Sequence, residues 1–151
     1  MSSHVRDSMT PIVRTAQMTQ SLIEAAALMR DDDVGSIPVV DNGQLVGIVT
    51  DRDIVVRAIA EQRDLARTTV DEIASHDPVT VGPDQDLNEA LELMATYQVR
   101  RLPVVEDGRL VGMLAQADLA LQAKEKKVGE ALHEISRPRE TAWQQSSEAR
   151  H

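Results

Sequence analysis

The hydrophobic positions follow a helical period twice along the chain, in the same local context. Two stretches have the i, i+3, i+4, i+7 spacing of a helix that buries one face, at Leu22, Ala25, Ala26 and Met29 and at Leu87, Ala90, Leu91 and Met94. A residue pair with capping-box spacing begins each stretch, Ser21 with Glu24 and Asp86 with Glu89. The pattern therefore predicts two similar helices, each with a polar N-cap.

Two short apolar runs flank a turn dipeptide after each predicted helix. Asn42-Gly43 and Asp107-Gly108 favour tight hairpins because both turn residues tolerate positive φ. The predicted hairpins pair residues 37–40 with 45–49 and residues 102–105 with 110–114. Helical patterns follow at 50–60 and 116–123, and short amphipathic entry helices are expected at 5–9, 70–73 and 128–132.

The similar elements reflect an internal repeat. Residues 36–55, SIPVVDNGQLVGIVTDRDIV, recur as RLPVVEDGRLVGMLAQADLA at 101–120, an offset of 65 residues that also superposes the preceding helices. A unit of about 60 residues buries too little surface to be secure alone, so the two copies are expected to share a core. We predict a first domain at 5–62, a linker at 63–68, a second domain with a C-terminal helix at 69–135 and a flexible tail at 136–151.

Composition excludes several classes of function. One Trp, one Tyr and no Phe leave almost no platform for stacking single-stranded bases, and a net charge of -9 argues against a nucleic-acid partner. Without cysteine there is no thiolate chemistry, and the four scattered histidines show no ligand spacing, so no metal site is expected. No apolar run is long enough for a membrane span and no apolar leader is present, so we expect a cytoplasmic protein with no membrane partner.

The repeated motifs resemble the cystathionine-β-synthase (CBS) domain family. The resemblance rests on the apolar-Pro-Val-Val strand, the acidic turn, Gly-x-Leu-Val-Gly and, in the first copy, Thr-x-x-Asp, and it covers residues 5–135. Residues 50–55 and 98–104 also resemble those of small stand-alone bacterial CBS pairs, among them a mycobacterial hypoxic response protein. The resemblance implies an α/β (α+β) fold, a Bateman module of two pseudo-symmetric βαββα repeats packed through their sheets. It also implies a regulatory protein, with a stress response as the expected setting.

The resemblance further implies clefts between the repeats that bind AMP, ADP, ATP or S-adenosylmethionine as a regulatory ligand, with no other cofactor required. In the first cleft, Asp53 would bind the ribose, Thr50 and Arg52 would lie near phosphate, and the base pocket would comprise Pro11, Ile12, Val13, Ser36, Ile37 and Pro38. The second cleft would comprise Asp77, Pro78, Val79, Arg100, Arg101, Leu102, Pro103 and Asp118. Ala115 stands where the first copy has Thr50, so we expect the first cleft to be the better ligand site.

Simpler explanations remain open for these residues. Thr50 and Asp53 also have the N-cap and N3 spacing that starts a helix without any ligand. Arg101 is favoured as a phosphate ligand, but the arginines at 100–101 could instead pair with surface carboxylates such as those at 31–33, and Arg52 could pair with Asp51. The acidic run at 31–33 is expected to be a solvated helix end rather than a magnesium site, because consecutive carboxylates point in different directions.

Two functions of different classes remain. The first is the ligand-sensing module, expected to form a homodimer through apolar helix faces with Ile54, Val55 and Leu119 as candidate contacts. The alternative is a ligand-free dimeric scaffold that binds another protein through its helices or the tail around Trp143. The chain has no acid, base or nucleophile arrangement with usable spacing, so an enzyme is not expected.

Overall fold

The computed structural model describes residues 3–11 and 14–119. Contacts divide the chain into two units, Met1–Gln116 and Ala117–His151, and residues 117–119 are the described part of the second unit. Residues 116–119 are helical, as the sequence predicted for the start of that segment. The entry helix expected at 128–132, the tail expected from residue 136, and the site candidates Ile12 and Val13 lie outside the described residues.

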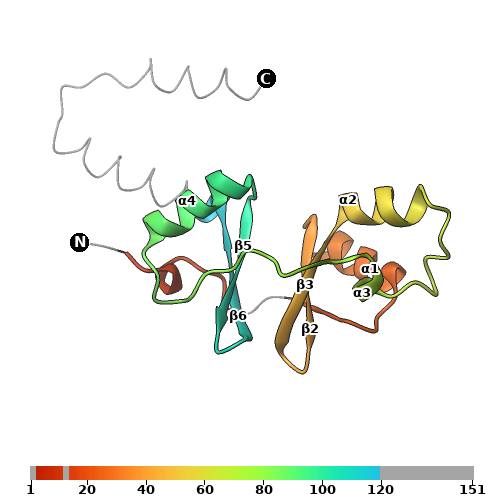
Figure 1. Ribbon diagram of the computed structural model, residues 1–151, viewed down its shortest axis with the longest axis horizontal. Helices are drawn as coiled ribbons and strands as arrows, with labels where there is room; N and C mark the ends of the chain where they lie inside the picture. The colour runs from red at the N-terminus through yellow and green to blue at the C-terminus, as the bar shows by residue number, and fades with distance from the viewer. Residues whose placement is uncertain (1–2, 12–13, 120–151) are drawn as a thin grey trace, which may run out of the picture. The chain divides into compact units, whose positions relative to one another are not determined.

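Each repeat builds one hairpin and one covering helix (Figure 1). The first repeat contains η1 (Val5–Asp7), β1 (Ala16–Gln17), α1 (Leu22–Asp32), β2 (Ser36–Asp41), β3 (Gln44–Thr50), α2 (Asp51–Asp53) and its π-helical continuation η2 (Ile54–Ile59). The second repeat contains α3 (Val70–Ile73), β4 (Ser75–His76), α4 (Leu87–Tyr97), β5 (Arg101–Glu106) and β6 (Arg109–Ala115). This order confirms the predicted mixed α/β class and the paired repeats.

Both predicted hairpins are present, and they match each other in detail. Asn42 and Gly43 have φ of 52° and 81°, and Asp107 and Gly108 have φ of 54° and 81°, as a two-residue hairpin turn requires. Each hairpin also has a register shift at the same place, between Val39 and Val40 and between Val104 and Val105, which leaves Val46 in β3 and Val111 in β6 without a register partner in the hairpin. The duplicated sequence therefore produces a duplicated backbone, down to the irregularity in strand register.

The two long helices bury a narrower stripe than predicted. Ser21 caps α1 by accepting a hydrogen bond from the Glu24 amide at 3.1 Å, whereas Asp86 accepts from the amide of Asn88 and not from that of Glu89. The buried positions are i, i+3 and i+7, namely Leu22, Ala25 and Met29 in α1 and Leu87, Ala90 and Met94 in α4. The predicted burial of Ala26 and Leu91 was wrong, because each helix covers a small sheet with a strip too narrow to include the i+4 residue.

Within the chain, the first segment of each repeat pairs with the hairpin of the other repeat, an arrangement called the exchange below. Ser75 in β4 pairs with Ile48 in the first repeat, and Thr10 pairs with Met113 in the second repeat. The entry elements cross in the same way, since the Val70 amide donates to the Gln20 carbonyl and the Val5 amide donates to the Gln85 carbonyl. Every one of these contacts is repeated at the offset of 65 residues.

This exchange produces the shared core that the sequence predicted. The core of the first repeat comprises Ala16, Leu22, Ala25, Met29, Ile37, Val39, Val49, Ile54, Ala58, Val70, Ile73 and Ala74. The last three belong to the second repeat. Strands β3 and β6 are also joined through the register pair Gln44–Arg109, which gives the sheet order β1-β2-β3-β6-β5. Within the described part of the chain, no helix has the length and apolar character needed to cross a bilayer.

Candidate functional site

Thr50 and Asp53 form a reciprocal pair at the start of α2. The Thr50 hydroxyl oxygen accepts a hydrogen bond from the Asp53 amide, and Asp53 Oδ2 accepts one from the Thr50 amide, both at 3.0 Å. The helix-start interpretation of this motif is therefore confirmed. Asp53 is half-buried, and its second carboxylate oxygen, Oδ1, has no hydrogen-bond partner within the described residues. The capping role thus leaves one carboxylate oxygen free to accept a hydrogen bond from a ligand.

Ser36 lies directly beside Thr50, because the two residues are register partners at the open end of the first hairpin. Directly opposite residues place their Cβ atoms about 5 Å apart. Side chains alternate along β2, so Ser36 and Pro38 share one face of the sheet, while Ile37 packs in the core on the other face and is 1% exposed. The structure brings Ser36, Thr50 and Asp53 together and places the Ile37 side chain away from them.

The second repeat has a different side-chain set at the corresponding place. Arg101 is the register partner of Ala115, just as Ser36 is of Thr50. The segment that contains Asp77, Pro78 and Val79 leads to Val81, which forms a parallel bridge with Val104 in the middle of β5. Leu102 and Pro103 are buried, and the half-buried Asp118 belongs to the second unit, within the helical residues 116–119.

The arginines expected near phosphate are not held by carboxylates in the described residues. The acidic run at 31–33 pairs instead with Arg14 and Arg30, through Asp32 at 3.1 Å and Asp31 at 3.0 Å. Asp31 and Asp32 lie in the last turn of α1 and Asp33 is its C-cap, so the predicted exposed helix end is confirmed. Arg52 donates its backbone amide to Asp51 Oδ1, but its guanidinium does not pair with that carboxylate. Arg52, Arg100 and Arg101 thus form no ion pair within this part of the chain.

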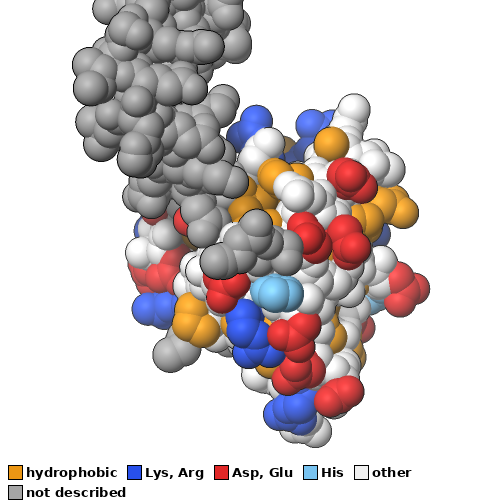
Figure 2. Space-filling model, turned by 90° about the vertical axis from the view of Figure 1, so that its left-hand side faces the viewer, with side chains coloured by type: hydrophobic (Ala, Val, Ile, Leu, Met, Phe, Trp, Pro, Cys, Tyr) orange, Lys and Arg blue, Asp and Glu red, His pale blue; other side chains and the backbone are white. Residues whose placement is uncertain are grey.

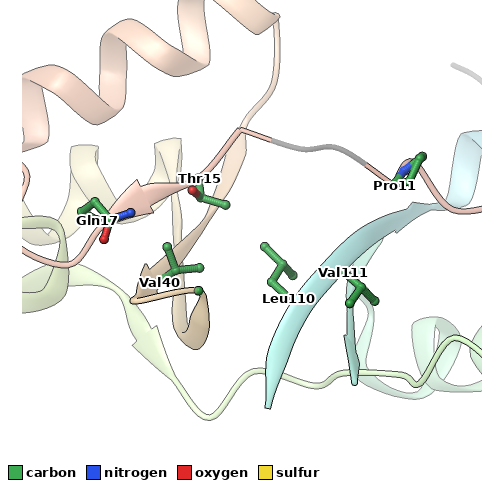
Figure 3. A pocket seen from close by; sticks show the side chains of 7 residues that line it. Pro11, Thr15, Gln17, Val40, Leu110 and Val111 are labelled. Carbon is green, nitrogen blue, oxygen red and sulfur yellow. The ribbon is translucent and has the colours of Figure 1, made fainter. Parts of the chain in front are cut away.

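An open cavity of about 310 Å³ lies on the same sheet face as Ser36 and Pro38, nearer the hairpin turn. In Figure 3, Thr15, Gln17 and Val40 lie on one side of it, and Leu110, Val111 and Pro11 on the other. The cavity-lining residues are Pro11, Thr15, Gln17, Val40, Gly43, Leu110 and Val111. Sequence reasoning named Pro11 and missed the other six. Strand alternation alone groups Thr15 with Gln17, but the approach of β6 depends on tertiary structure.

Two charged groups outside this cavity have shifted pKa values. The Thr69 amide and hydroxyl both donate to Glu72, and these hydrogen bonds lower the pKa of that carboxyl below its usual value. A hydrogen bond from Arg6 to Asp84, together with their opposite charges, raises the pKa of Arg6. Both groups stabilise the ends of exchanged entry elements, which indicates a structural role.

Charges of both signs mix on the surface. On the face shown in Figure 2, Asp and Glu side chains are interspersed with Lys and Arg over the described residues, without a continuous basic area. The described residues also contain no group of three or more His, Cys, Asp and Glu side chains placed to hold a metal ion. The chemistry that the site offers is hydrogen bonding to a polar ligand, through the groups of Thr50 and Asp53.

Comparison with known proteins extends over both repeats. The model of the CBS domain family matches residues 5–59 and 70–125. The CBS domain-containing protein YhcV of Bacillus subtilis is 45% identical over 135 residues, which span 89% of this chain and 96% of YhcV. Hypoxic response protein 1 of Mycobacterium tuberculosis is 34% identical over 134 residues, which span 88% of this chain and 94% of that protein.

Solved structures have the same fold. The crystal structure of Hypoxic Response Protein I, with two coordinated zinc ions, aligns with a TM-score of 0.73 and 36% identity over 78% of this chain and 97% of that one. CBSX2 in complex with AMP aligns with a TM-score of 0.73 and 28% identity over 82% and 98% of the two chains. The CBS pair of protein MJ0100, in complex with 5′-methylthioadenosine and S-adenosylmethionine, aligns with a TM-score of 0.73 and 29% identity over 83% and 99%.

Proposed function

Because the chain belongs to the CBS domain family, we propose that this regulatory CBS pair binds an adenosyl ligand at the site formed by Thr50 and Asp53. The observation that carries the proposal is Asp53 Oδ1, which has no hydrogen-bond partner among the described residues while Oδ2 accepts from the Thr50 amide, at the end of the hairpin where Ser36 begins β2. Ribose hydroxyls would donate to that oxygen. AMP, 5′-methylthioadenosine and S-adenosylmethionine are bound by two of the aligned proteins, which supports this ligand class.

The net negative charge of the protein affects how the phosphate of a nucleotide can be bound. A net charge of -9 repels an anionic nucleotide, so phosphate binding requires a local cation. Arg52 lies in the first turn of α2, next to Asp53, and its guanidinium has no carboxylate partner among the described residues. In this proposal Asp53 holds the ribose and Arg52 offsets the phosphate charge, whereas the second site, with Ala115 in place of Thr50, lacks that hydroxyl.

Regulation would follow from unequal binding to two arrangements of the repeats. A ligand shifts such an equilibrium only by the difference between its affinities for the two states. The exchanged segments tie each repeat to the other through backbone pairs such as Ser75–Ile48. A ligand at Thr50 and Asp53 therefore acts on a structure in which movement of one repeat is transmitted to the other.

The test is calorimetric titration with AMP, ADP, ATP, 5′-methylthioadenosine and S-adenosylmethionine, on the natural chain and on Asp53→Asn. The asparagine retains an oxygen that can accept the Thr50 amide but loses the negative charge, so the fold is kept while a charge-assisted bond to ribose is weakened. Such bonds contribute about 1.5–3 kcal/mol, which corresponds to a loss of affinity of roughly ten-fold or more. Asp51→Asn, an exposed acid in the same turn, is the matched control and is expected to bind normally.

A ligand lacking the hydroxyl makes the test specific for ribose. 2′-Deoxy-AMP should bind the natural chain more weakly than AMP, and Asp53→Asn should reduce that difference. If none of the five adenosyl compounds binds the natural chain, the ligand proposal is wrong. If Asp53→Asn and Asp51→Asn bind as tightly as the natural chain, the ligand lies elsewhere.

An exposed apolar surface supports a homodimer, the assembly expected both for the ligand-sensing module and for the alternative, a ligand-free scaffold. Val55, Val56 and Ile59 along η2 are 54%, 47% and 52% exposed. Of the contacts predicted for a homodimer, Ile54 and Leu119 are instead buried, because Ile54 packs into the core of its own repeat. Val55 remains available, with Val56 and Ile59 beside it. In this proposal the η2 surface, defined as Val55, Val56 and Ile59, pairs with the same surface of a second copy.

A further inference from the structure

Met9 lies in the first exchanged segment, residues 3–11, and packs against a glycine of the second repeat. A Cβ on Gly112 would stand 2.8 Å from Met9 Sδ and 3.3 Å from Met9 Cγ, so the thioether covers the bare face of that glycine. The next residue, Thr10, forms a backbone bridge with Met113, in which the Thr10 amide donates at 2.8 Å and the Met113 amide donates back at 3.0 Å. The thioether of Met9 therefore lies directly beside the pairing between this segment and the second hairpin.

The internal repeat shows that this position does not require a methionine. At the offset of 65 residues, Met9 corresponds to Ala74 and Gly112 corresponds to Gly47. A Cβ on Gly47 would stand 3.5 Å from the Cβ of Ala74, so the two contacts are equivalent. Ala74 makes its contact with a methyl group alone. The fold thus needs neither a long side chain nor a sulfur atom here, and the first exchanged segment differs from the second by an oxidisable group.

The burial of the methionines determines which of them an oxidant in solution can reach. The chain has six methionines and no cysteine, so thioethers are its only sulfur groups. Met29, Met94 and Met113 are buried. Met9 and Met18 are the half-buried methionines of the described residues, and Met18 packs against the core of the first repeat. Because oxidation of sulfur depends on its exposure, Met9 and Met18 are expected to react before the three buried methionines.

We propose that Met9 is a site of reversible oxidation by hydrogen peroxide, and that its sulfoxide releases Thr10 from Met113. Met9 Sδ attacks one oxygen of the peroxide, an S–O bond forms as the O–O bond breaks, the sulfur is oxidised and the peroxide is reduced to water. The sulfoxide is polar, and a polar group held against Gly112 without a hydrogen-bond partner is disfavoured. The oxidised side chain therefore turns toward water. This reaction needs no ligand at Thr50 and Asp53, so it does not depend on the proposed function.

The release is expected to be local, because the two ends of the first exchanged segment are held differently. At its start, the Val5 amide donates to the Gln85 carbonyl at 2.9 Å, and Arg6 Nε donates to Asp84 Oδ1 at 3.0 Å. At its end, the bridge to Met113 and the contact of Met9 with Gly112 join it to the second hairpin. Oxidation of Met9 removes a contact from the end of the segment and leaves its start anchored.

The experiment treats the natural chain with dilute hydrogen peroxide and measures deuterium labelling of single backbone amides by NMR. Peptide mass spectrometry locates the added oxygen. The Thr10 and Met113 amides should be labelled about ten-fold faster once Met9 is oxidised, the effect of an unpaired polar group on a local opening. The Val5 and Val70 amides, at the starts of the two exchanged segments, should keep their rates. Reduction by methionine sulfoxide reductase should restore the protection of Thr10 and Met113.

Matched variants separate the sulfur of Met9 from the volume of its side chain. Met9→Leu keeps an apolar side chain of similar volume, so it should fold normally and lose the peroxide effect. Met9→Ala, which has the residue of the other repeat, should lose the effect as well. Met18→Leu should retain it. Met9→Gln, a polar side chain of similar length, should show fast labelling of Thr10 without peroxide. Met1, which lies outside the described residues, is present in every variant, so its oxidation cannot produce these differences.

Three results would overturn the proposal. In the first, peroxide oxidises Met18 while Met9 stays unmodified. In the second, Met9 sulfoxide forms, but the Thr10 and Met113 amides keep the protection of the untreated chain. In the third, peroxide speeds the labelling of these two amides as strongly in Met9→Leu and Met9→Ala as in the natural chain, which would assign the effect to another methionine.

Discussion

Gly47 lies so close to Ser75 that a Cβ on the glycine would stand 2.6 Å from the serine carbonyl oxygen. The same relationship occurs in the second repeat, where a Cβ on Gly112 would stand 2.7 Å from the Thr10 carbonyl oxygen. In both cases the atom that approaches belongs to the exchanged segment of the other repeat. The final glycine of Gly-x-Leu-Val-Gly is therefore explained by the backbone that packs across it.

Gly47→Ala is expected to destabilise the protein by about 1–3 kcal/mol, because a rigid backbone oxygen must move to admit the methyl group. Urea denaturation of the variant measures the loss. Gly82→Ala is the control, since the added methyl would meet nothing closer than 3.9 Å. Equal stabilities for the two alanine variants would show that the close approach at Gly47 is not a constraint in solution.

Thr50→Ala is expected to cost about 1 kcal/mol of stability in the absence of any ligand, because the Asp53 amide loses its cap. Thr50→Ser retains the hydroxyl and should keep most of the stability. The melting temperatures of both variants check this, with exposed Thr80→Ala as the control for removing a surface hydroxyl. An unchanged melting temperature in Thr50→Ala would contradict the capping role.

Lowering the pH should destabilise the start of α3, because protonation of Glu72 weakens its hydrogen bonds with Thr69. The folded state lowers the pKa of this carboxyl because Thr69 donates two hydrogen bonds to it. A lowered pKa gives stability that is present above the unfolded-state pKa, near 4.5, and is lost as the pH falls through the folded-state pKa. Unfolding free energies measured in a pH series should therefore fall more steeply in the natural chain than in Glu72→Gln.

At neutral pH, Glu72→Gln should be less stable than the natural chain, and the difference should shrink in acid. Glu61→Gln, at an exposed position just after η2, reports the effect of removing a surface negative charge alone. Parallel pH curves for the natural chain and Glu72→Gln would show that the Thr69 hydrogen bonds do not form in solution.

Charges on the η2 surface should abolish self-association if that surface forms the dimer. Val56→Glu combined with Ile59→Glu places two carboxylates where apolar side chains would be buried, and like charges would then face each other across the interface. Light scattering after size-exclusion chromatography should show a dimer for the natural chain and a monomer for the double variant. Gln62→Glu serves as a charge control, and a natural chain that is monomeric at all concentrations would rule out this interface.

Local sequence determined much of the fold because its signals act over a few residues. The Asn42-Gly43 and Asp107-Gly108 turns, the Ser21 cap and the Thr50–Asp53 cap all depend on backbone groups within four positions. The repeat then predicted that each element would occur twice. Ala26 and Leu91 were assigned wrongly because the width of the buried stripe depends on the sheet beneath each helix, which the helical period does not encode.

Only the tertiary structure decided how the two halves share their segments and which residues meet across them. The sequence by itself determined two matched βαββα units, their turns and caps, and a motif that places Asp53 beside Thr50. It could not place Leu110 opposite Val40 or Ser75 over Gly47, because those contacts join residues of different repeats. The physical reason is that turns and caps depend on short-range hydrogen bonds. The exchange depends instead on the apolar surface buried by both repeats together, and through it Val70 and Ile73 complete the core of the other repeat.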